Sequence, residues 1–257
     1  MITSALSVII PAYNEEKRSA KNLSKVLKYL HKNYPDFELI IVDDGSTDDM
    51  ANVVRKAIIK EPRAKLITYV PNRGKGYAVR TGVLASSGDT VLFMDADLST
   101  PLAEIPKILK KLEGADIVIG SRGKSDAPFG RQVASFIFDQ VKYMMVGLRR
   151  FRDTQCGFKA FRGEVARKLF AKSQVDRFMF DVEILYLAEK LKLKIIELHV
   201  DWSDVPDSRV RFWEGVVNMF RDLWRIRHLH SKTQKLEKSC RRQSLWRRTA
   251  KTQKNGK

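Results

Sequence analysis

The sequence has few cysteines and no long apolar segment near its start. Cys156 and Cys240 are its only cysteines, too few for a disulfide scaffold or a four-cysteine zinc site, so we expect a reducing, cytoplasmic compartment. Residues 1–14 carry no charge, but they contain Pro11 and fall short of the ~20 apolar residues that a spanning helix needs. They also lack the basic start of a signal peptide. The sequence therefore predicts a protein that neither crosses a membrane nor depends on disulfides.

Glycine and proline are present in ordinary amounts, which excludes collagen-like and low-complexity classes. Hydrophobic residues make up 44% of the 257 residues, enough for one full core, and the length predicts one or two domains.

Acidic residues are scarce relative to basic ones, and the formal net charge is +18. Residues 231–257 contain ten Lys and Arg but a single acid, Glu237, so this segment carries +9. The remaining residues carry the other +9, from 38 basic and 29 acidic groups. We expect 231–257 to be a disordered basic tail attracted to anionic lipid or to nucleic acid; a merely solvating tail is the alternative.

Short apolar segments alternate with segments of helical periodicity through the first two-thirds of the chain. Helix 15–32 is predicted from apolar residues at helical spacing, and Ser46 or Thr47 is predicted to cap the next helix. Strands are predicted at 6–10, 37–42, 66–70, 91–94, 117–119 and 194–200. This alternation indicates an α/β fold with a doubly wound, mostly parallel sheet, in which ligands bind at the carboxyl ends of the strands.

The composition changes after Gly120. Residues 121–131 predict a mobile loop, and helices are predicted at 132–148, 180–191 and 210–229. The last of these places Trp213, Phe220 and Trp224 on one side with arginines at the flanks, as in a helix that lies at a membrane interface. Packing of the same apolar side into the core is the alternative.

Two common nucleotide-binding patterns are not matched by the sequence. The segment from Asn72 to Gly76 is glycine-rich, but Val79 stands where the dinucleotide fingerprint needs another small residue, and no Gly-Lys-Ser/Thr occurs. We therefore expect neither an NAD enzyme nor a P-loop ATPase.

Polar, acidic clusters follow three of the predicted strands. They are Asn14-Glu15-Glu16, Asp43-Asp44 and Asp95-Ala96-Asp97. Two carboxylates separated by one residue at a strand end suit Mg²⁺ or Mn²⁺ that is also held by substrate phosphates. The alternative is that these acids are solvated or cap helices.

Four segments resemble the ordered motifs of family-two glycosyltransferases, which have the GT-A fold: VIIPAYNEE (8–16), IIVDDGSTD (40–48), NRGKGYAVRTG (72–82) and LFMDADLST (92–100). Four more resemble the dolichyl-phosphate β-glucosyltransferase branch of that family: GSR (120–122), RDTQCGFKAF (152–161), FDVEILYLAEKL (180–191) and MFRDLWRIR (219–227). The resemblance covers roughly residues 5–230, so we expect a catalytic domain at 1–230. Its acceptor loop and interfacial helices are expected at about 121–152 and 207–230.

The resemblance assigns roles to individual residues. It implies that the nucleotide sugar is bound by Pro11, Tyr13, Glu15, Asp44, Lys75 and Asp95. It implies that the metal is bound by Asp95 and Asp97, with Asp97 also catalytic. Arg122 and Arg131 match basic positions that suit an acceptor phosphate, because a guanidinium can donate two parallel hydrogen bonds.

Asp153 is the other catalytic residue that the motif implies. A prenyl phosphate is already largely dianionic at pH 7, because its second pKa is about 6, so no acceptor proton needs to be removed. We therefore expect Asp153 to orient the site or bind a sugar hydroxyl rather than to act as an obligatory base. Cys156 has no His or Cys neighbour in sequence and is expected to be buried; Asp181 and Glu183 are expected either to make structural hydrogen bonds or to contact substrate.

The expected activity is the inverting transfer of a hexose to a dolichyl or polyprenyl phosphate, by a peripheral protein on the cytoplasmic face of an anionic membrane. The DTQCGFK segment favours UDP-glucose as the donor, and GDP-mannose is second. Ser99 stands where related mannosyl enzymes can carry a longer metal-reaching side chain, and serine is a poorer metal ligand. A soluble acceptor remains an alternative. A nucleic-acid-binding protein is another, but no nucleic acid is expected, since the chain has no recognised module for it and its tail has Trp246 as its single aromatic residue.

Overall fold

The computed structural model describes residues 5–123, 145–148, 150–203 and 221–230. Its strands are β1 (Leu6–Ala12), β2 (Phe37–Asp43), β3 (Ala64–Thr68), β4 (Thr90–Met94), β5 (Ile117–Ser121), β6 (Phe158–Arg162) and β7 (Ile195–His199). Its helices are α1 (Glu16–Asn33), α2 (Met50–Ile58), α3 (Lys75–Leu84), α4 (Ile105–Leu112), α6 (Gly163–Phe170) and α7 (Phe180–Lys190), with a short 3₁₀ turn at Leu102–Glu104. Residues 221–230 are also helical. Arg131, the basic tail and most of the two predicted interfacial helices lie outside the described residues.

The strands form one sheet in the order β3-β2-β1-β4-β6-β5-β7. Every pairing is parallel except those of β6, which runs antiparallel to both β4 and β5. The predicted α/β class with a mostly parallel sheet is therefore confirmed. Strand β6 was not predicted, because Lys159 and Arg162 interrupt its five residues and no continuous apolar segment marks it.

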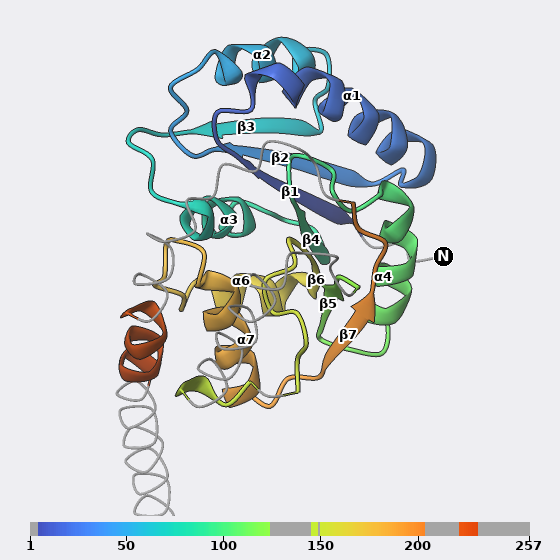
Figure 1. Cartoon of the computed structure of the whole chain (residues 1–257). Helices are drawn as coiled ribbons and strands as arrows, with labels where there is room; N and C mark the ends of the chain where they lie inside the picture. The colour runs from blue at the N-terminus through green and yellow to red at the C-terminus, as the bar shows by residue number, and fades with distance from the viewer. Residues whose placement is uncertain (1–4, 124–144, 149, 204–220, 231–257) are drawn as a thin grey trace, which may run out of the picture.

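Helices cover both faces of the sheet (Figure 1). Helices α1, α2 and α4 pack on one face, where Leu23, Val26 and Leu30 of α1 lie at helical spacing in the core. Helices α3, α6 and α7 pack on the other face, and Leu223 and Ile226 of the helical segment 221–230 belong to the same core. The two cores, separated by the sheet, are the doubly wound arrangement that the sequence predicted.

The predicted cap of α2 is wrong. The helix begins at Met50, and the side chain of the preceding Asp49 makes no capping hydrogen bond; the Met50 backbone N–H donates to Asp48 Oδ1 at 3.2 Å instead. Ser46 and Thr47 instead connect two loops at the sheet edge: the Ser46 hydroxyl accepts from the Asn14 backbone N–H at 2.9 Å, and the Thr47 N–H donates to Asn14 Oδ1 at 2.8 Å. Asn14 adopts the left-handed conformation, with φ of 54°, which an asparagine tolerates better than most residues.

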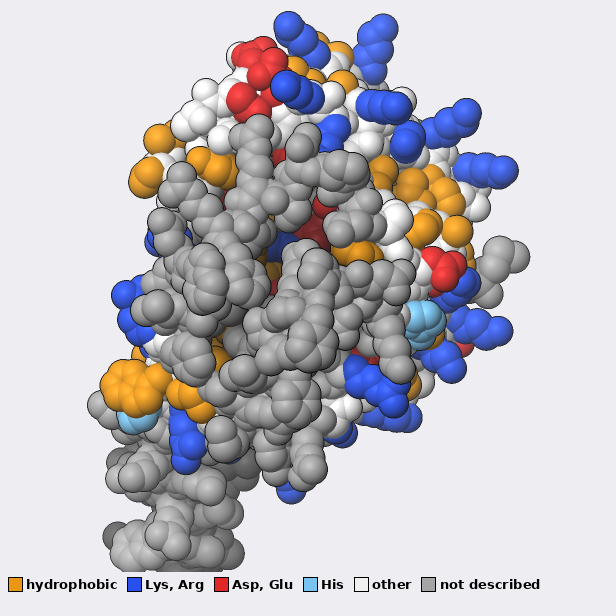
Figure 2. All heavy atoms as spheres, viewed as in Figure 1, with side chains coloured by type: hydrophobic (Ala, Val, Ile, Leu, Met, Phe, Trp, Pro, Cys, Tyr) orange, Lys and Arg blue, Asp and Glu red, His pale blue; other side chains and the backbone are white. Residues whose placement is uncertain are grey.

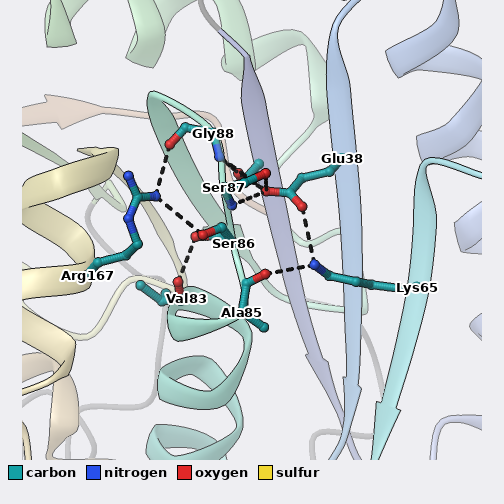
Figure 3. A network of polar contacts seen from close by, with 9 residues as sticks. Glu38, Lys65, Val83, Ala85, Ser86, Ser87, Gly88 and Arg167 are labelled. Carbon is teal, nitrogen blue, oxygen red and sulfur yellow. Dashed lines mark hydrogen bonds and ion pairs between the residues drawn. The ribbon is translucent and has the colours of Figure 1, made fainter.

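A polar network closes the opposite edge of the sheet, where the parallel strands begin (Figure 3). Glu38 of β2 accepts hydrogen bonds from the Ser7 hydroxyl and from the backbone and hydroxyl of Ser87, and its second oxygen lies 3.3 Å from Lys65 Nζ. Burial alone would raise the pKa of Glu38, but these donors and the Lys65 charge lower it to about 2. Arg167 of α6 donates to backbone carbonyls of the same turn, so the network connects the sheet to the helical layer.

The helical segment 221–230 is fastened to α7 by a buried polar contact. His230 Nε2 lies 2.7 Å from Glu183 Oε1, and Glu183 also accepts the backbone N–H groups of Gln174 and Val175. Trp224 on the same segment is 58% exposed. The predicted helix 210–229 had two alternatives, a helix at a membrane interface and a helix packed into the core. Its described end has both a core-packed side and an exposed aromatic residue. Among the described residues, no helix has the length and apolar content that a membrane span requires.

Candidate active site

The predicted acidic residues meet at the edge where β1, β2 and β4 end. Asp95 and Asp97 follow β4, and Asp153 lies in the loop before β6. Because β6 is antiparallel to β4, its first residues lie at the edge where β4 ends, and Phe158 pairs with Met94. One reversed strand thus brings the segment Asp153–Gly157 beside the Asp-x-Asp motif, although about 60 residues of sequence separate them.

Gly157 lies directly against the Asp95 carboxylate. A Cβ atom at this position would be 1.9 Å from Asp95 Oδ2 and 2.3 Å from Asp95 Cγ, so no other residue fits without displacing that carboxylate. Gly157 lies in the RDTQCGFKAF motif (152–161), four residues after Asp153, but the sequence alone predicted no role for it.

Lys75, the first residue of α3, pairs with Asp95. Its Nζ lies 2.6 Å from Asp95 Oδ1. Burial alone would lower the pKa of Lys75, but the carboxylates of Asp95 and then Asp181 raise it, so the ammonium stays charged. A cation therefore already lies against the carboxylate that the sequence assigned to a metal.

The donor set suits a divalent cation that shares its coordination with a substrate. Asp95 and Asp97 supply hard carboxylate oxygens from a partly exposed turn, and Asp97 Oδ1 accepts the Ser99 backbone N–H at 2.9 Å. Within the described ranges, no three His, Cys, Asp or Glu side chains converge on one metal position. Mg²⁺ typically uses one or two carboxylates together with waters and substrate phosphates, so the residues present fit Mg²⁺ or Mn²⁺ held in this way.

Asp44 organises the glycine-rich loop that precedes α3. Its buried carboxylate accepts from the Tyr69 hydroxyl at 2.8 Å, from the Asn72 side-chain amide at 2.8 Å, and from the backbone N–H groups of Arg73 and Gly74. The pKa of Tyr69 is raised, by burial first and then by the Asp44 carboxylate. Asp44 was predicted to contact the nucleoside; in the structure both of its oxygens hold the loop that leads to Lys75.

The other residues assigned to the nucleotide sugar lie at the end of β1 and in the turn after it. Pro11 is buried in β1, whereas Tyr13 is 44% exposed and can present its ring to a ligand. Glu15 forms an ion pair with Arg18 one turn into α1. These residues and Asp44 lie at the ends of the neighbouring strands β1 and β2, as predicted from the sequence.

Arg122 and Asp153 form a bidentate ion pair. Arg122 Nε and Nη2 lie 2.6 and 2.9 Å from the two oxygens of Asp153, and the Arg122 backbone N–H also donates to this carboxylate. Burial alone would raise the pKa of Asp153, but Arg122 lowers it below the usual range. The Arg122 guanidinium also lies 5.5 Å from the ring of Trp202. The ion pair with Arg122 thus favours the charged form of Asp153, and the orienting role of Asp153 stays a prediction.

A second, fully buried ion pair lies behind the motif. Lys159 Nζ is 2.6 Å from Asp181 Oδ1 and donates to the Cys156 carbonyl oxygen at 2.5 Å. Lys159 was not predicted to be a site residue, because a lysine in an aromatic strand carries no signal of burial. Cys156 is buried as predicted, and burial raises the pKa of its thiol to about 11, which leaves it unreactive at neutral pH.

Acidic and basic side chains lie side by side near the centre of the face shown in Figure 2. The residues described above provide such a mixture: acids that attract a cation, beside Lys and Arg that attract phosphate. A site of this kind can bind a divalent metal and two anionic groups together.

Comparison with known proteins places the chain in a family. Residues 7–170 match the family described as Glycosyl transferase family 2. The chain is 38% identical over 241 residues to the dolichyl-phosphate beta-glucosyltransferase of Dictyostelium discoideum, covering 86% of this chain and 73% of that protein. It is 36% identical over 246 residues to the protein of the same name from Homo sapiens, covering 88% of this chain and 75% of that protein.

The fold is also similar to solved structures. A glucosyl-3-phosphoglycerate synthase from Mycobacterium tuberculosis in complex with phosphoglyceric acid aligns with a TM-score of 0.61 at 22% identity, covering 89% of this chain and 79% of that one. The same synthase in complex with Mn²⁺, UDP-glucose and phosphoglyceric acid aligns with a TM-score of 0.57 at 21% identity, covering 86% of this chain and 77% of that one. These likenesses establish the fold.

Proposed function

The chain belongs to glycosyl transferase family 2, and from this premise we propose that it transfers glucose from UDP-glucose to dolichyl phosphate, with inversion at the anomeric carbon. The observation that carries the proposal is the contact between Gly157 and Asp95, which joins the DTQCGFK segment to the Asp-x-Asp motif. That segment is the part of the sequence that most narrowly resembles the dolichyl-phosphate branch, and relatives 34–41% identical to this chain carry that name.

For the donor half of the site, we assign the nucleoside to Pro11, Tyr13, Glu15 and Asp44. Tyr13 supports this assignment with an exposed ring, and Asp44 contributes through the loop that it holds. Asp95 and Asp97 are proposed to hold Mg²⁺ or Mn²⁺, which when bound neutralises the leaving diphosphate as a Lewis acid. Lys75 adds a second positive charge next to the leaving diphosphate.

For the acceptor half, we assign the phosphate to Arg122 and Arg131. The Arg122 fork is held by Asp153 through Nε and Nη2, and its Nη1 group is proposed to donate to a phosphate oxygen. In the transfer, an acceptor phosphate oxygen forms the bond to the anomeric carbon while the bond to the UDP oxygen breaks. Asp153 orients Arg122 and the sugar, and no proton has to move because the phosphate is already ionised.

We further propose that the protein attaches peripherally to the cytoplasmic leaflet, where anionic lipids gather. The +9 charge of residues 231–257 supports this attachment, and so do the exposed Trp224 and its neighbours Arg221, Arg225 and Arg227, which are exposed on the same helical segment. The 1–230 catalytic domain and the basic tail are thus proposed as separate functional parts.

The direct test incubates the purified protein with Mn²⁺, dolichyl phosphate and, in parallel reactions, UDP-glucose, UDP-galactose and GDP-mannose, each labelled in the sugar. We expect labelled glucosyl lipid from UDP-glucose alone, and no product with EDTA. Preferential transfer from GDP-mannose would replace the proposed donor. Transfer to a water-soluble acceptor with no prenyl phosphate present would replace the proposed acceptor.

A further inference from the structure

Charges of alternating sign extend from the edge of the sheet into the core. Asp95 pairs with Lys75 at 2.6 Å, and Asp181 pairs with Lys159 at 2.6 Å. The two pairs are neighbours because α3 and α7 meet at their first turns: a Cβ added to Gly76 would lie 2.6 Å from Phe180 Cβ. Lys75 and Asp181 occupy these same first turns.

Burial of the inner pair, Lys159 and Asp181, costs free energy, and neither side chain has a role in the proposed transfer. Lys159 is 1% exposed and Asp181 is 3% exposed. Desolvation of two charges commonly outweighs their attraction, and buried ion pairs can often be replaced by apolar residues without loss of stability. A pair retained at this depth, next to the carboxylate assigned to the metal, therefore points to a role beyond packing.

Lys75 needs a second negative partner if Asp95 binds a metal. The ammonium and a divalent cation would compete for one carboxylate and repel each other at short range. Asp181 lies close enough to act on Lys75, because Gly76, which follows Lys75, packs against Phe180, which precedes Asp181. It lies at the first turn of α7, where the helix dipole favours a negative charge.

We propose that Asp181, with its charge balanced by Lys159, is a positioning residue that keeps the Lys75 ammonium beside the donor diphosphate when Asp95 turns to the metal. Lys159 holds Asp181 in place through its hydrogen bonds to Asp181 and to the Cys156 carbonyl, and its Nζ lies 5.2 Å from the Phe93 ring. The proposal rests on the proposed function for the metal and the nucleotide, but not on the identity of the acceptor.

The test uses the full chain and a double variant, Lys159→Met with Asp181→Leu. Replacing both members avoids leaving one unpaired charge in the core. Binding of UDP is measured by calorimetry in saturating Mn²⁺, and free Mn²⁺ is measured by its paramagnetic resonance signal at fixed UDP. Asp181→Asn, which keeps the shape of the side chain and its acceptor oxygen, is measured in parallel so that a folding defect of the double variant does not decide the result.

We expect both variants to weaken Mn²⁺ and UDP binding about tenfold or more while the double variant keeps the thermal midpoint close to that of the wild type. Lys75→Met should produce a similar loss, and the double substitution should have no further effect in a Lys75→Met background, because residues that act through one another are not additive. Lys65→Met is the matched control: it removes a lysine from an ion pair at the opposite sheet edge and should leave both affinities unchanged.

Unchanged Mn²⁺ and UDP affinities in a folded double variant would overturn the proposal, and so would full additivity with Lys75→Met. If the wild type itself bound neither Mn²⁺ nor UDP, the proposed function would be overturned together with it. If the wild type bound Mn²⁺ and UDP, and both the double variant and Asp181→Asn bound them equally well, only the positioning role of Asp181 would be overturned.

Discussion

Gly157→Ala is the smallest change that should disable the proposed metal site. The substitution adds one methyl group to a backbone whose φ is not positive, so alanine is compatible with the local conformation. The three atoms nearest to the added Cβ all belong to the Asp95 side chain: Oδ2 at 1.9 Å, Cγ at 2.3 Å and Oδ1 at 2.5 Å.

The size of the effect follows from these distances. Ordinary van der Waals contact begins at 3.4 Å, so the Asp95 carboxylate has to move by more than 1 Å. A misplacement of about 1 Å in a catalytic group can lower the rate about 10²-fold. The Asp95 side chain is 36% exposed, so it can move toward solvent without disrupting the core. We therefore expect a fall in kcat of roughly 10²-fold and a higher Mn²⁺ requirement, with little change in stability.

The assay compares sugar transfer across a Mn²⁺ titration for Gly157→Ala and for Gly114→Ala. Gly114 is the matched control, because an added Cβ there meets no atom within 4 Å and its φ is not positive either. Thermal unfolding of both variants monitors the fold. If Gly157→Ala transferred sugar as fast as Gly114→Ala at every Mn²⁺ concentration, Asp95 could not be the ligand that we assign.

Three other outcomes are expected. Asp97→Asn should lower turnover at least ~10²-fold without unfolding the protein, and near-normal turnover in saturating Mn²⁺ would contradict its metal role. Glu38→Gln should lower the free energy of unfolding by about 1–3 kcal/mol at pH 7. Since the pKa of Glu38 is lowered from 4.5 to about 2, this stabilisation is complete above pH 4.5 and is lost as the pH falls toward 2, so denaturant titrations of the two proteins should converge at acid pH. Removal of residues 231–257 should sharply reduce sedimentation with anionic vesicles, because each engaged Lys or Arg contributes about 1 kcal/mol, yet should leave turnover on a short prenyl phosphate unchanged; equal sedimentation would require another partner for the tail.

The parallel part of the fold was predictable from the sequence because its strands are short apolar segments that end in polar clusters. Strand β6 was not, because its five residues include Lys159, a charged side chain whose partner Asp181 lies near it only in the folded protein. Periodicity reports on apolar burial, and a buried ion pair between residues 22 positions apart leaves no periodic trace.

The candidate site likewise contains features that the sequence predicted and features that it did not. The Asp-x-Asp motif and Lys75 were identified from the sequence, since their chemistry depends on residue type and on order along the chain. The contact of Gly157 with Asp95 and the bidentate pairing of Arg122 with Asp153 depend on which strands are neighbours and in which direction they run. The sequence alone does not show which strands are neighbours or in which direction they run.

Glu183 connects three stretches of the chain that lie apart in sequence. Its carboxylate holds the backbone of Gln174 and Val175, and the Val175 carbonyl oxygen lies against Gly76 at the start of α3. Its side-chain partner, His230, is translated 47 residues later. Removal of the helical segment 221–230 would therefore leave the Glu183 carboxylate without this histidine partner, next to backbone that packs against the start of α3.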